Sequence, residues 1–250
     1  MQRLMFRARS GRSFSRPDLK RARSRRPGSF ARALGFVLAA GLSLGVGACG
    51  GSGDSMALQL VYAPTHDVDL AKTGGVPPVA SGTQIWINPV TDARVDPGRI
   101  GISEEEDNTP IYYAAGQNPG DFVRNVLAKE LTTLGLPITA NQAAATHALN
   151  LQLQKFWVTE GNNYLGEVTV GAALVDINGQ LLWQGQLTGA AKRWGRSFEE
   201  DNFLEAYSDM VLDLAERVAM DPTLRNALAT NQPQPYVAQP VASQPAAPQP

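Results

Sequence analysis

The stretch Val168-Thr-Val-Gly-Ala-Ala-Leu-Val-Asp-Ile-Asn-Gly-Gln-Leu-Leu-Trp-Gln-Gly-Gln-Leu-Thr188 decides the fold class. Two apolar runs, 168–177 and 180–188, flank the dipeptide Asn178-Gly179. Asn-Gly between two such runs is the strongest short-range signal for a β-hairpin closed by a type I′ turn. The sequence therefore predicts an antiparallel hairpin as the centre of the fold.

Alternating apolar residues predict more strands on the N-terminal side of this hairpin. They lie at 57–63, at 84–90, in a short segment at Ile100 and Ile102, and from Leu149 to Val158.

Apolar residues at helical spacing follow Asp121, and Gly135 with Pro137 supplies the stop signal for that helix. A second helix is expected from Ser197-Phe-Glu-Glu200, which fits a capping box, and a short third helix from Asp221-Pro222. The predicted fold class is α+β, a largely antiparallel sheet with two main helices packed on one face. We expect it to form a single domain over residues 57–230.

The charge of the 250-residue chain is divided unevenly, although its formal total is -1. Residues 1–32 contain half of the 22 Lys and Arg residues and a single acid, Asp18, so this leader carries about +10 and the remainder about -11. Because an acidic body repels phosphates, nucleic acid is not an expected partner.

Residues 33–48 are uncharged, and this segment is shorter than the roughly 20 residues that cross a bilayer. A basic segment, an apolar segment and then small residues are typical of a secretory signal peptide, which we place at 1–48. A buried structural thiol is the alternative interpretation of Cys49, the chain's only cysteine. One cysteine also excludes an intramolecular disulfide.

The sequence Val46-Gly-Ala-Cys49 resembles the bacterial lipobox. The resemblance implies that Cys49 carries a diacylglyceryl group on sulfur and an acyl chain on its new amine, and no other cofactor is expected. Two or more chains hold a protein stably on a membrane. Gly50, which follows the cysteine, favours a periplasm-facing position on the outer membrane, with the inner membrane as the alternative.

Flexible segments flank the predicted domain. Residues 49–56 contain the lipidated end and a Gly/Ser tether, and residues 231–250 form a tail rich in Pro and Gln without a charge. We interpret the tail as an extended spacer, with contact to a partner as the alternative.

A second resemblance rests on Gln84-Ile-Trp-Ile-Asn-Pro-Val-Thr-Asp-Ala-Arg94, on Ile100-Gly101 and on a helix closing with Leu134-Gly-Leu136. Together these stretches resemble the YajG-like family of outer-membrane lipoproteins. The resemblance implies a lipid-anchored periplasmic α+β domain. Auxiliary lipoproteins of lipid-transporting ABC systems and penicillin-binding-protein activators share a similar layout.

Two groups of charged residues are candidate sites. Asp92 and Arg94 form either a turn-closing pair, which we favour, or part of a ligand contact. The basic-aromatic cluster of Lys192, Arg193, Trp194 and Arg196 stands out in an acidic body. It is a candidate contact for anionic glycan, lipid headgroups or a protein partner, and protective charge at a strand edge is the simpler alternative.

Metal and catalytic sites are not expected. The acidic run 104–107 lacks the spacing of a calcium loop, and His66 and His147 stand alone in the sequence. No set of nucleophile, base and orienting residue is evident, so we predict that the protein is not an enzyme.

The predicted function is that of a lipid-anchored cell-envelope lipoprotein that binds or supports another envelope component by protein contacts. The alternative is an auxiliary lipoprotein of a lipid or solute transport system with a small hydrophobic groove.

Overall fold

The computed structural model describes residues 55–71, 77–195 and 197–233. Cys49, the predicted signal peptide and most of the predicted tether and tail lie outside the described residues. The strands are β1 (Met56–Leu58), β2 (Ile85–Ile87), β3 (Thr91–Asp92), β4 (Arg99–Ser103), β5 (Thr109–Tyr113), β6 (His147–Glu160), β7 (Asn163–Asp176) and β8 (Leu181–Trp194). The helices are α1 (Pro119–Thr133), α2 (Glu200–Met220) and α3 (Pro222–Thr230), with a short 3₁₀ helix at Gln142–Ala144.

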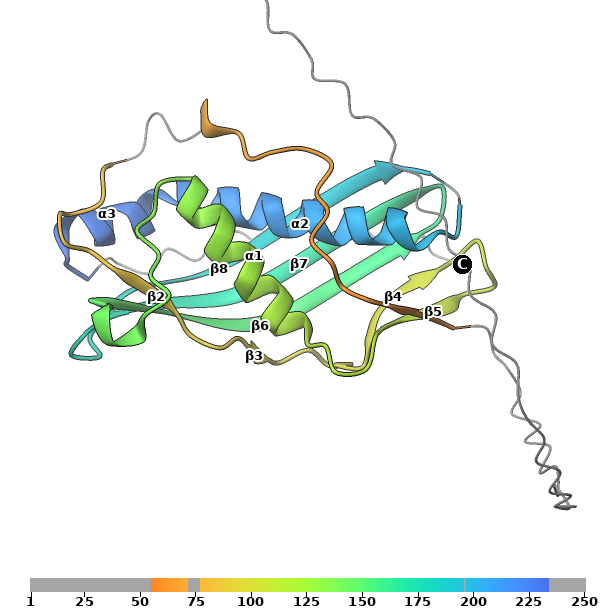
Figure 1. Cartoon of the computed structure of the whole chain (residues 1–250), viewed down its shortest axis with the longest axis horizontal. Coiled ribbons are helices and arrows are strands. Elements are labelled where there is room, and N and C mark those ends of the chain that lie inside the picture. Colours follow the sequence, from red (N-terminus) through yellow and green to blue (C-terminus); the bar gives the residue numbers. More distant parts are fainter. Residues whose placement is uncertain (1–54, 72–76, 196, 234–250) are drawn as a thin grey trace, which may run out of the picture. The chain divides into compact units, whose positions relative to one another are not determined.

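The sheet is built on three long strands, β6, β7 and β8, which form an antiparallel meander (Figure 1). The other edge of β6 pairs in turn with β2, β3 and β4, all parallel to it. Strand β5 then pairs antiparallel with β4, and β1 adds in parallel to give the order β1-β5-β4-β6-β7-β8. The predicted α+β class with a mostly antiparallel sheet is confirmed.

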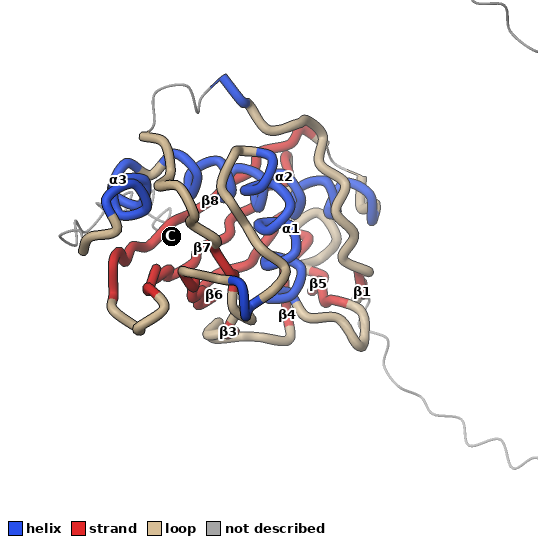
Figure 2. Tube along the Cα trace, turned by 60° about the vertical axis from the view of Figure 1, so that its left-hand side comes forward, coloured by secondary structure: helices blue, strands red, loops and turns tan. Residues whose placement is uncertain are grey.

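The helices lie on one side of this sheet, so the molecule has two layers (Figure 2). Helix α2 crosses β7 and β8, and α1 packs beside it. Asn118 caps α1 by accepting a hydrogen bond from the Gly120 N–H, and Pro119 occupies the first turn, where a missing N–H costs nothing. Among the described residues, no helix is long and apolar enough to cross a membrane.

Two predicted strands are shorter than expected, because their later residues do not form the backbone hydrogen bonds of a sheet. The strand predicted at 57–63 ends at Leu58, since the Leu60 N–H donates to Gln117 Oε1 (2.6 Å) and the Ala63 N–H to Ser208 Oγ (2.9 Å). The strand predicted at 84–90 ends at Ile87, shortly before Pro89, which has no N–H to donate. Strand β5 was not predicted, because its sequence contains Pro110.

The prediction of a type I′ turn at Asn178-Gly179 is wrong, although the hairpin exists. Gly179 has φ +80°, but Asn178 does not adopt positive φ. The Gly179 N–H donates to the Asp176 carbonyl, and Asp176 Oδ1 accepts from the Asn178 and Gln180 N–H groups. This is a type I turn followed by a left-handed glycine, which Asp176 fixes through its side chain.

The capping box predicted at Ser197–Glu200 is also wrong. Helix α2 begins at Glu200, and its N-cap residue, Glu199, makes no side-chain capping bond. Ser197 Oγ instead accepts a hydrogen bond from Asn202 Nδ2. The short helix after Asp221 is as predicted, and the Asp221 side chain accepts from the Leu224 N–H.

Candidate functional site

The face of the sheet beneath α2 is closed by direct helix-sheet contact. Three glycines, Gly101, Gly166 and Gly189, lie under the helix. A Cβ at Gly189 would lie 2.6 Å from the Leu214 amide nitrogen, and one at Gly166 would lie 3.2 Å from the Ala206 carbonyl oxygen. The helix backbone therefore rests on the strand backbone, with no room for a ligand between them.

Aromatic rings pack between α2 and the sheet on this side. Phe156 stacks on Tyr207 with ring centroids 4.9 Å apart, and Tyr164 meets Phe203 edge-on at 5.0 Å. Burial raises the pKa of Tyr207 well above its usual value, and its hydroxyl donates to the Ile100 carbonyl at 2.8 Å. This hydroxyl has a structural role, since it ties α2 to β4.

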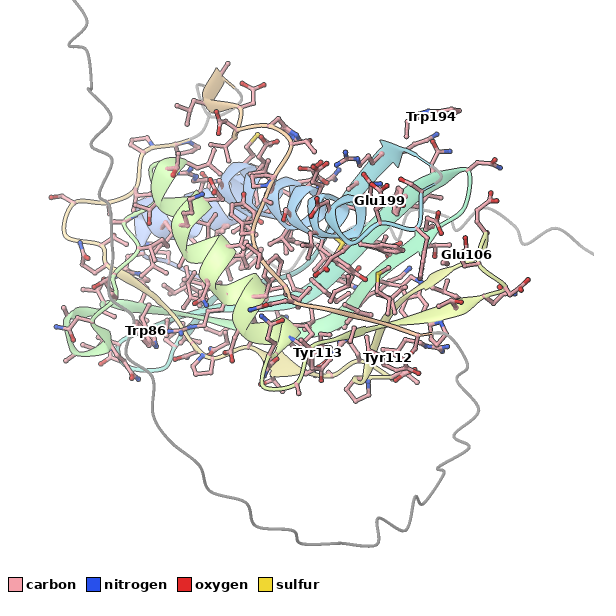
Figure 3. The ribbon with its side chains drawn as sticks, turned by 45° about the vertical axis from the view of Figure 1, so that its right-hand side comes forward. Trp86, Glu106, Tyr112, Tyr113, Trp194 and Glu199 are labelled. Atoms are coloured by element: carbon pink, nitrogen blue, oxygen red, sulfur yellow. The ribbon has the colours of Figure 1, made fainter. Side chains whose placement is uncertain are left out.

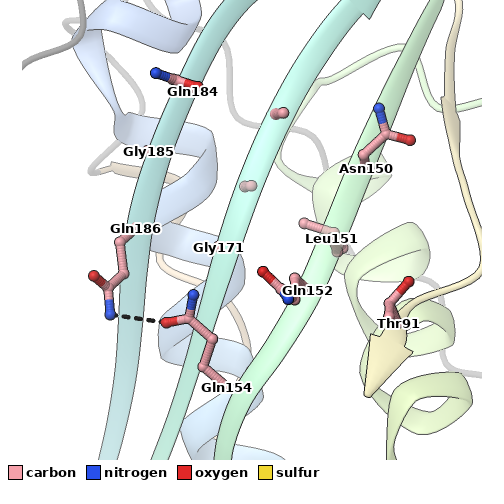
Figure 4. A pocket seen from close by; sticks show the side chains of 11 residues that line it. Thr91, Asn150, Leu151, Gln152, Gln154, Gly171, Gln184, Gly185 and Gln186 are labelled. Atoms are coloured by element: carbon pink, nitrogen blue, oxygen red, sulfur yellow. Dashed lines mark hydrogen bonds between the residues drawn. The ribbon is translucent and has the colours of Figure 1, made fainter. Parts of the chain in front are cut away.

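Among the described residues, no helix covers the opposite face (Figure 2), and amide side chains line a hollow of about 500 Å³ across its central strands. Two rows of paired residues line the hollow, and each row contains one residue from β6, one from β7 and one from β8. The first row is Asn150, Ala173 and Gln184, and the second is Gln152, Gly171 and Gln186. We call this surface, together with Gln154, the amide groove (Figure 4).

A hydrogen bond crosses the floor of the amide groove. Gln186 Nε2 on β8 donates to Gln154 Oε1 on β6 at 3.0 Å, so the two side chains reach over β7 (Figure 4). Gly171 makes this possible, because a Cβ there would lie 2.9 Å from Gln154 Nε2. None of the described residues that line the groove is charged. Amides both donate and accept, so the groove suits a polar, uncharged segment of a partner.

A second feature of the open face lies at one end of the sheet. Tyr112, Leu165 and Trp194 are 39%, 51% and 79% exposed, and Trp157 is half-buried. With the half-buried Ile102 and Pro110 these residues form what we call the apolar strip. Figure 3 shows Trp194 extending from the end of β8.

The predicted basic-aromatic cluster is divided between the two faces. Lys192 is exposed on the open face, where it lies opposite Leu165, and Trp194 lies on the same face. Arg193 points to the helix side and forms an ion pair with Glu205 of α2. Arg196 lies outside the described residues. Trp194 therefore belongs to the apolar strip and Lys192 lies beside it, whereas Arg193 stabilises the packing of α2.

Asp92 and Arg94 are brought together in a turn-closing geometry. Arg94 Nε and Nη2 donate to the two Asp92 oxygens at 2.9 and 2.8 Å, and the guanidinium also donates to the carbonyls of Pro97 and Arg99. Burial favours the neutral form of Asp92, but the hydrogen bonds from Arg94 outweigh it and lower the pKa of Asp92 below its usual value. The guanidinium is thus committed to its own loop.

Neither histidine belongs to a cluster of ligating groups within the part of the chain that the structure describes. Thr65 donates its hydroxyl proton to Asp209 (2.7 Å), so His66 Nδ1, 3.1 Å from that hydroxyl, can only donate to it. That is the reverse of a base activating a nucleophile. His147 Nε2 lies 2.9 Å from Asn231 Oδ1. Over residues 55–71, 77–195 and 197–233, no group of three or more His, Cys, Asp or Glu could hold a metal.

The acidic run 104–107 forms the exposed turn between β4 and β5. Beside it, Ser103 and Glu160 are buried, and Ser103 Oγ donates to Glu160 Oε2. Glu160 Oε1 has no hydrogen-bond partner. Neither this pair nor the amide groove was predicted from the sequence. Gln152 and Gln154 alternate with buried leucines in β6, and Gln184 and Gln186 lie between the buried Trp183 and Leu187 in β8.

Comparison with known proteins gives similarities of fold alone. No family model and no curated protein sequence matches the chain. A DUF330 protein from Xanthomonas campestris is 14% identical, with 63% of this chain and 95% of that chain covered and a TM-score of 0.45. The PelC dodecamer from Paraburkholderia phytofirmans gives 19% identity, 58% and 92% coverage and a TM-score of 0.37.

Lipoproteins are also among the similar solved structures. A minor lipoprotein from Acinetobacter baumannii is 13% identical, with 57% of this chain and 96% of that chain covered and a TM-score of 0.31. Similarity at this level says nothing about function. The resemblance to the YajG-like family, which these structures do not test, stays a prediction.

Proposed function

We propose that this protein is a lipid-anchored lipoprotein of the cell envelope, without catalytic activity, whose domain binds or supports another envelope component. The observation that carries the proposal is the order of features around Cys49: a basic leader, an uncharged segment, small residues and the only cysteine. The chain then enters β1 at Met56, so the anchor and the domain are separated by a short tether. Gly50 favours the outer membrane.

The open face supports a role in protein contacts. The helix side is closed by packing of α2 on Gly166 and Gly189, whereas the amide groove is a hollow of about 500 Å³ that presents donors and acceptors. A polar surface with neutral hydrogen-bonding groups is typical of protein interfaces that form outside the hydrophobic core of a complex. We place the partner contact on this face.

Replacing Cys49 by Ala tests the anchor. The wild-type protein is expected in the membrane fraction and labelled by a clickable palmitate analogue, while Cys49→Ala is expected in the soluble periplasmic fraction without label. Gly51→Ala, which leaves the lipobox unchanged, is the matched control and should behave as the wild type. Membrane retention and labelling of Cys49→Ala would show that the anchor is elsewhere.

Site-specific photocrosslinking in cells tests the contact surface. A photoreactive residue at Gln186, on the open face, is expected to give discrete crosslinked products. The same residue at Arg217, half-exposed on α2, is the control and should give none. Equal products from both positions, or products from Arg217 alone, would move the partner contact away from the open face.

A second candidate function is an auxiliary role in lipid or solute transport. A hollow of about 410 Å³ between α1 and the segment after β1 favours it, since Leu60, Tyr62, Phe122 and Val126 supply apolar lining. A fluorescent fatty acid should then bind the wild type and lose affinity in Phe122→Ser. Absence of saturable binding by the wild type would exclude this function.

A further inference from the structure

We infer that the apolar strip at the end of the open face contacts the membrane surface beside the lipid anchor, with Trp194 inserted among the lipid headgroups. The inference rests on the proposed lipidation of Cys49. Tyr112, Leu165 and Trp194 are exposed on the same face and at the same end of the sheet, and apolar residues gathered in this way mark interaction sites.

The strand register places the strip at the end of the sheet where the tether enters. One row of paired residues crosses the whole sheet from β1 to β8: Met56, Ile111, Gly101, Val158, Gly166 and Ala191. Strand β8 runs opposite to β1, so the chain after Ala191 runs in the direction from which the tether arrives. Trp194 therefore lies beyond this row, at the end of the sheet where the described chain enters β1.

The tether limits how far this end of the domain can lie from the membrane. Six residues separate Met56 from Cys49, and the seven Cα–Cα steps between them span about 25 Å in a fully extended chain. The opposite end of the sheet, at Asn178, lies the length of a 14-residue strand away, about 45 Å. An anchor at Cys49 thus keeps Met56, at the same end of the sheet as the apolar strip, within about 25 Å of the bilayer surface, whereas the β7-β8 turn can lie farther from it.

The side chains of the strip match the chemistry of a membrane interface. Trp and Tyr are enriched at the headgroup level, because their rings are apolar with one polar tip. Lys192 lies beside Leu165. The Arg99 guanidinium, which pairs with Asp96 at 3.2 Å, lies 5.2 Å from the ring centroid of Trp157.

The other charges near the strip determine which lipid headgroup charge the strip can approach. Glu167 is paired with Lys155 at 2.8 Å and adds no net charge. The exposed acidic turn 104–107 extends from the same end of the sheet. Because this turn opposes binding to anionic lipids, the strip fits a zwitterionic surface such as phosphatidylethanolamine.

Tryptophan quenching in vesicles tests the contact. The lipidated protein is reconstituted into phosphatidylethanolamine-phosphatidylcholine vesicles with or without bromine on the acyl chains. Brominated lipid is expected to quench the wild type, and Trp194→Phe should lose at least half of that quenching. The control Trp183→Phe, which replaces a buried ring bonded to Thr223 on the helix side, should keep it.

A second pair of variants introduces charge. Leu165→Glu at the strip should abolish quenching while the lipid anchor keeps the protein on the vesicles. The control Ile177→Glu, at a residue that is 78% exposed at the opposite end of the sheet, should leave quenching unchanged. Protein that floats with the vesicles but shows equal quenching in the wild type and Trp194→Phe would overturn the inference. Protein that does not float at all would instead overturn the proposed lipid anchor.

Discussion

The two faces of the sheet use the same residue type for opposite purposes. On the helix side, Gly189 allows the backbone of α2 to rest on β8, and a Cβ there would lie 2.8 Å from the Leu214 Cβ. On the open side, Gly171 leaves a gap that the end of the flexible Gln154 side chain fills. The helix-covered face is packed as a core, and the other face is a surface that a partner can contact. The neighbours of a glycine therefore determine whether it allows close helix packing or leaves room for a flexible side chain.

Removing a large ring from each face should give the widest contrast in stability. Phe203 is fully buried between Tyr164 and Phe198, so Phe203→Ala is expected to lower the free energy of unfolding by about 3–5 kcal/mol. Trp194→Ala, at 79% exposure, should change it by no more than about 0.5 kcal/mol. Urea unfolding followed by circular dichroism measures both. Similar losses would mean that the strip is part of the core.

Adding a methyl group to each glycine should give the next contrast. Gly189→Ala forces the new Cβ against the α2 backbone, which is expected to cost about 1–3 kcal/mol. Gly171→Ala only displaces the Gln154 amide and breaks its bond to Gln186, so the cost should stay below about 1 kcal/mol. Thermal unfolding of the two variants side by side measures the difference. A larger loss of stability in Gly171→Ala than in Gly189→Ala would show that the open face is tightly packed in the isolated protein.

Sequence patterns predicted the long elements of the fold because those elements carry their own periodicity. Strands β6, β7 and β8 alternate between buried and exposed residues, and α1 repeats its apolar residues at helical spacing. Short strands such as β3 and β5 could not be predicted, because their pairing with β6 and β4 defines them rather than their own residues. The turn at Asp176 was misassigned because a side-chain acceptor, and not the Asn-Gly dipeptide alone, fixes it.

The candidate site was less predictable than the fold. Lys192 and Arg193 are neighbours in sequence, but adjacent strand residues point to opposite faces, so one lies beside the apolar strip and the other pairs with Glu205. The amide groove needed the register of three strands, which places Gln152 and Gln186 in one row. Composition showed that glutamines were present without showing that they converge.

Breaking one ion pair on each side of the sheet should give a smaller contrast. Arg94 is buried and donates to Asp92, Pro97 and Arg99, so Arg94→Ala is expected to lower the free energy of unfolding by about 2 kcal/mol. Lys155, on the open face, is about as exposed as its partner Glu167, and Lys155→Ala should cost less than about 1 kcal/mol. Chemical denaturation at low and high salt measures both, and only the Lys155 pair should weaken clearly with salt.

The smallest expected effect is on the free energy of unfolding at acidic pH, to which Asp92 contributes. Hydrogen bonds from Arg94 hold the pKa of Asp92 below its unfolded value, despite the opposing effect of burial. A carboxylate with a lowered folded-state pKa stabilises the protein above the unfolded pKa, about 3.9, and this contribution disappears as the pH falls through the folded-state pKa. The wild type should therefore be more stable than Asp92→Asn at about pH 6, and the difference should shrink below about pH 4. Urea midpoints measured across this range test the prediction, because a gap that stays constant or widens in acid would mean that Asp92 is not the group whose ionisation stabilises this loop.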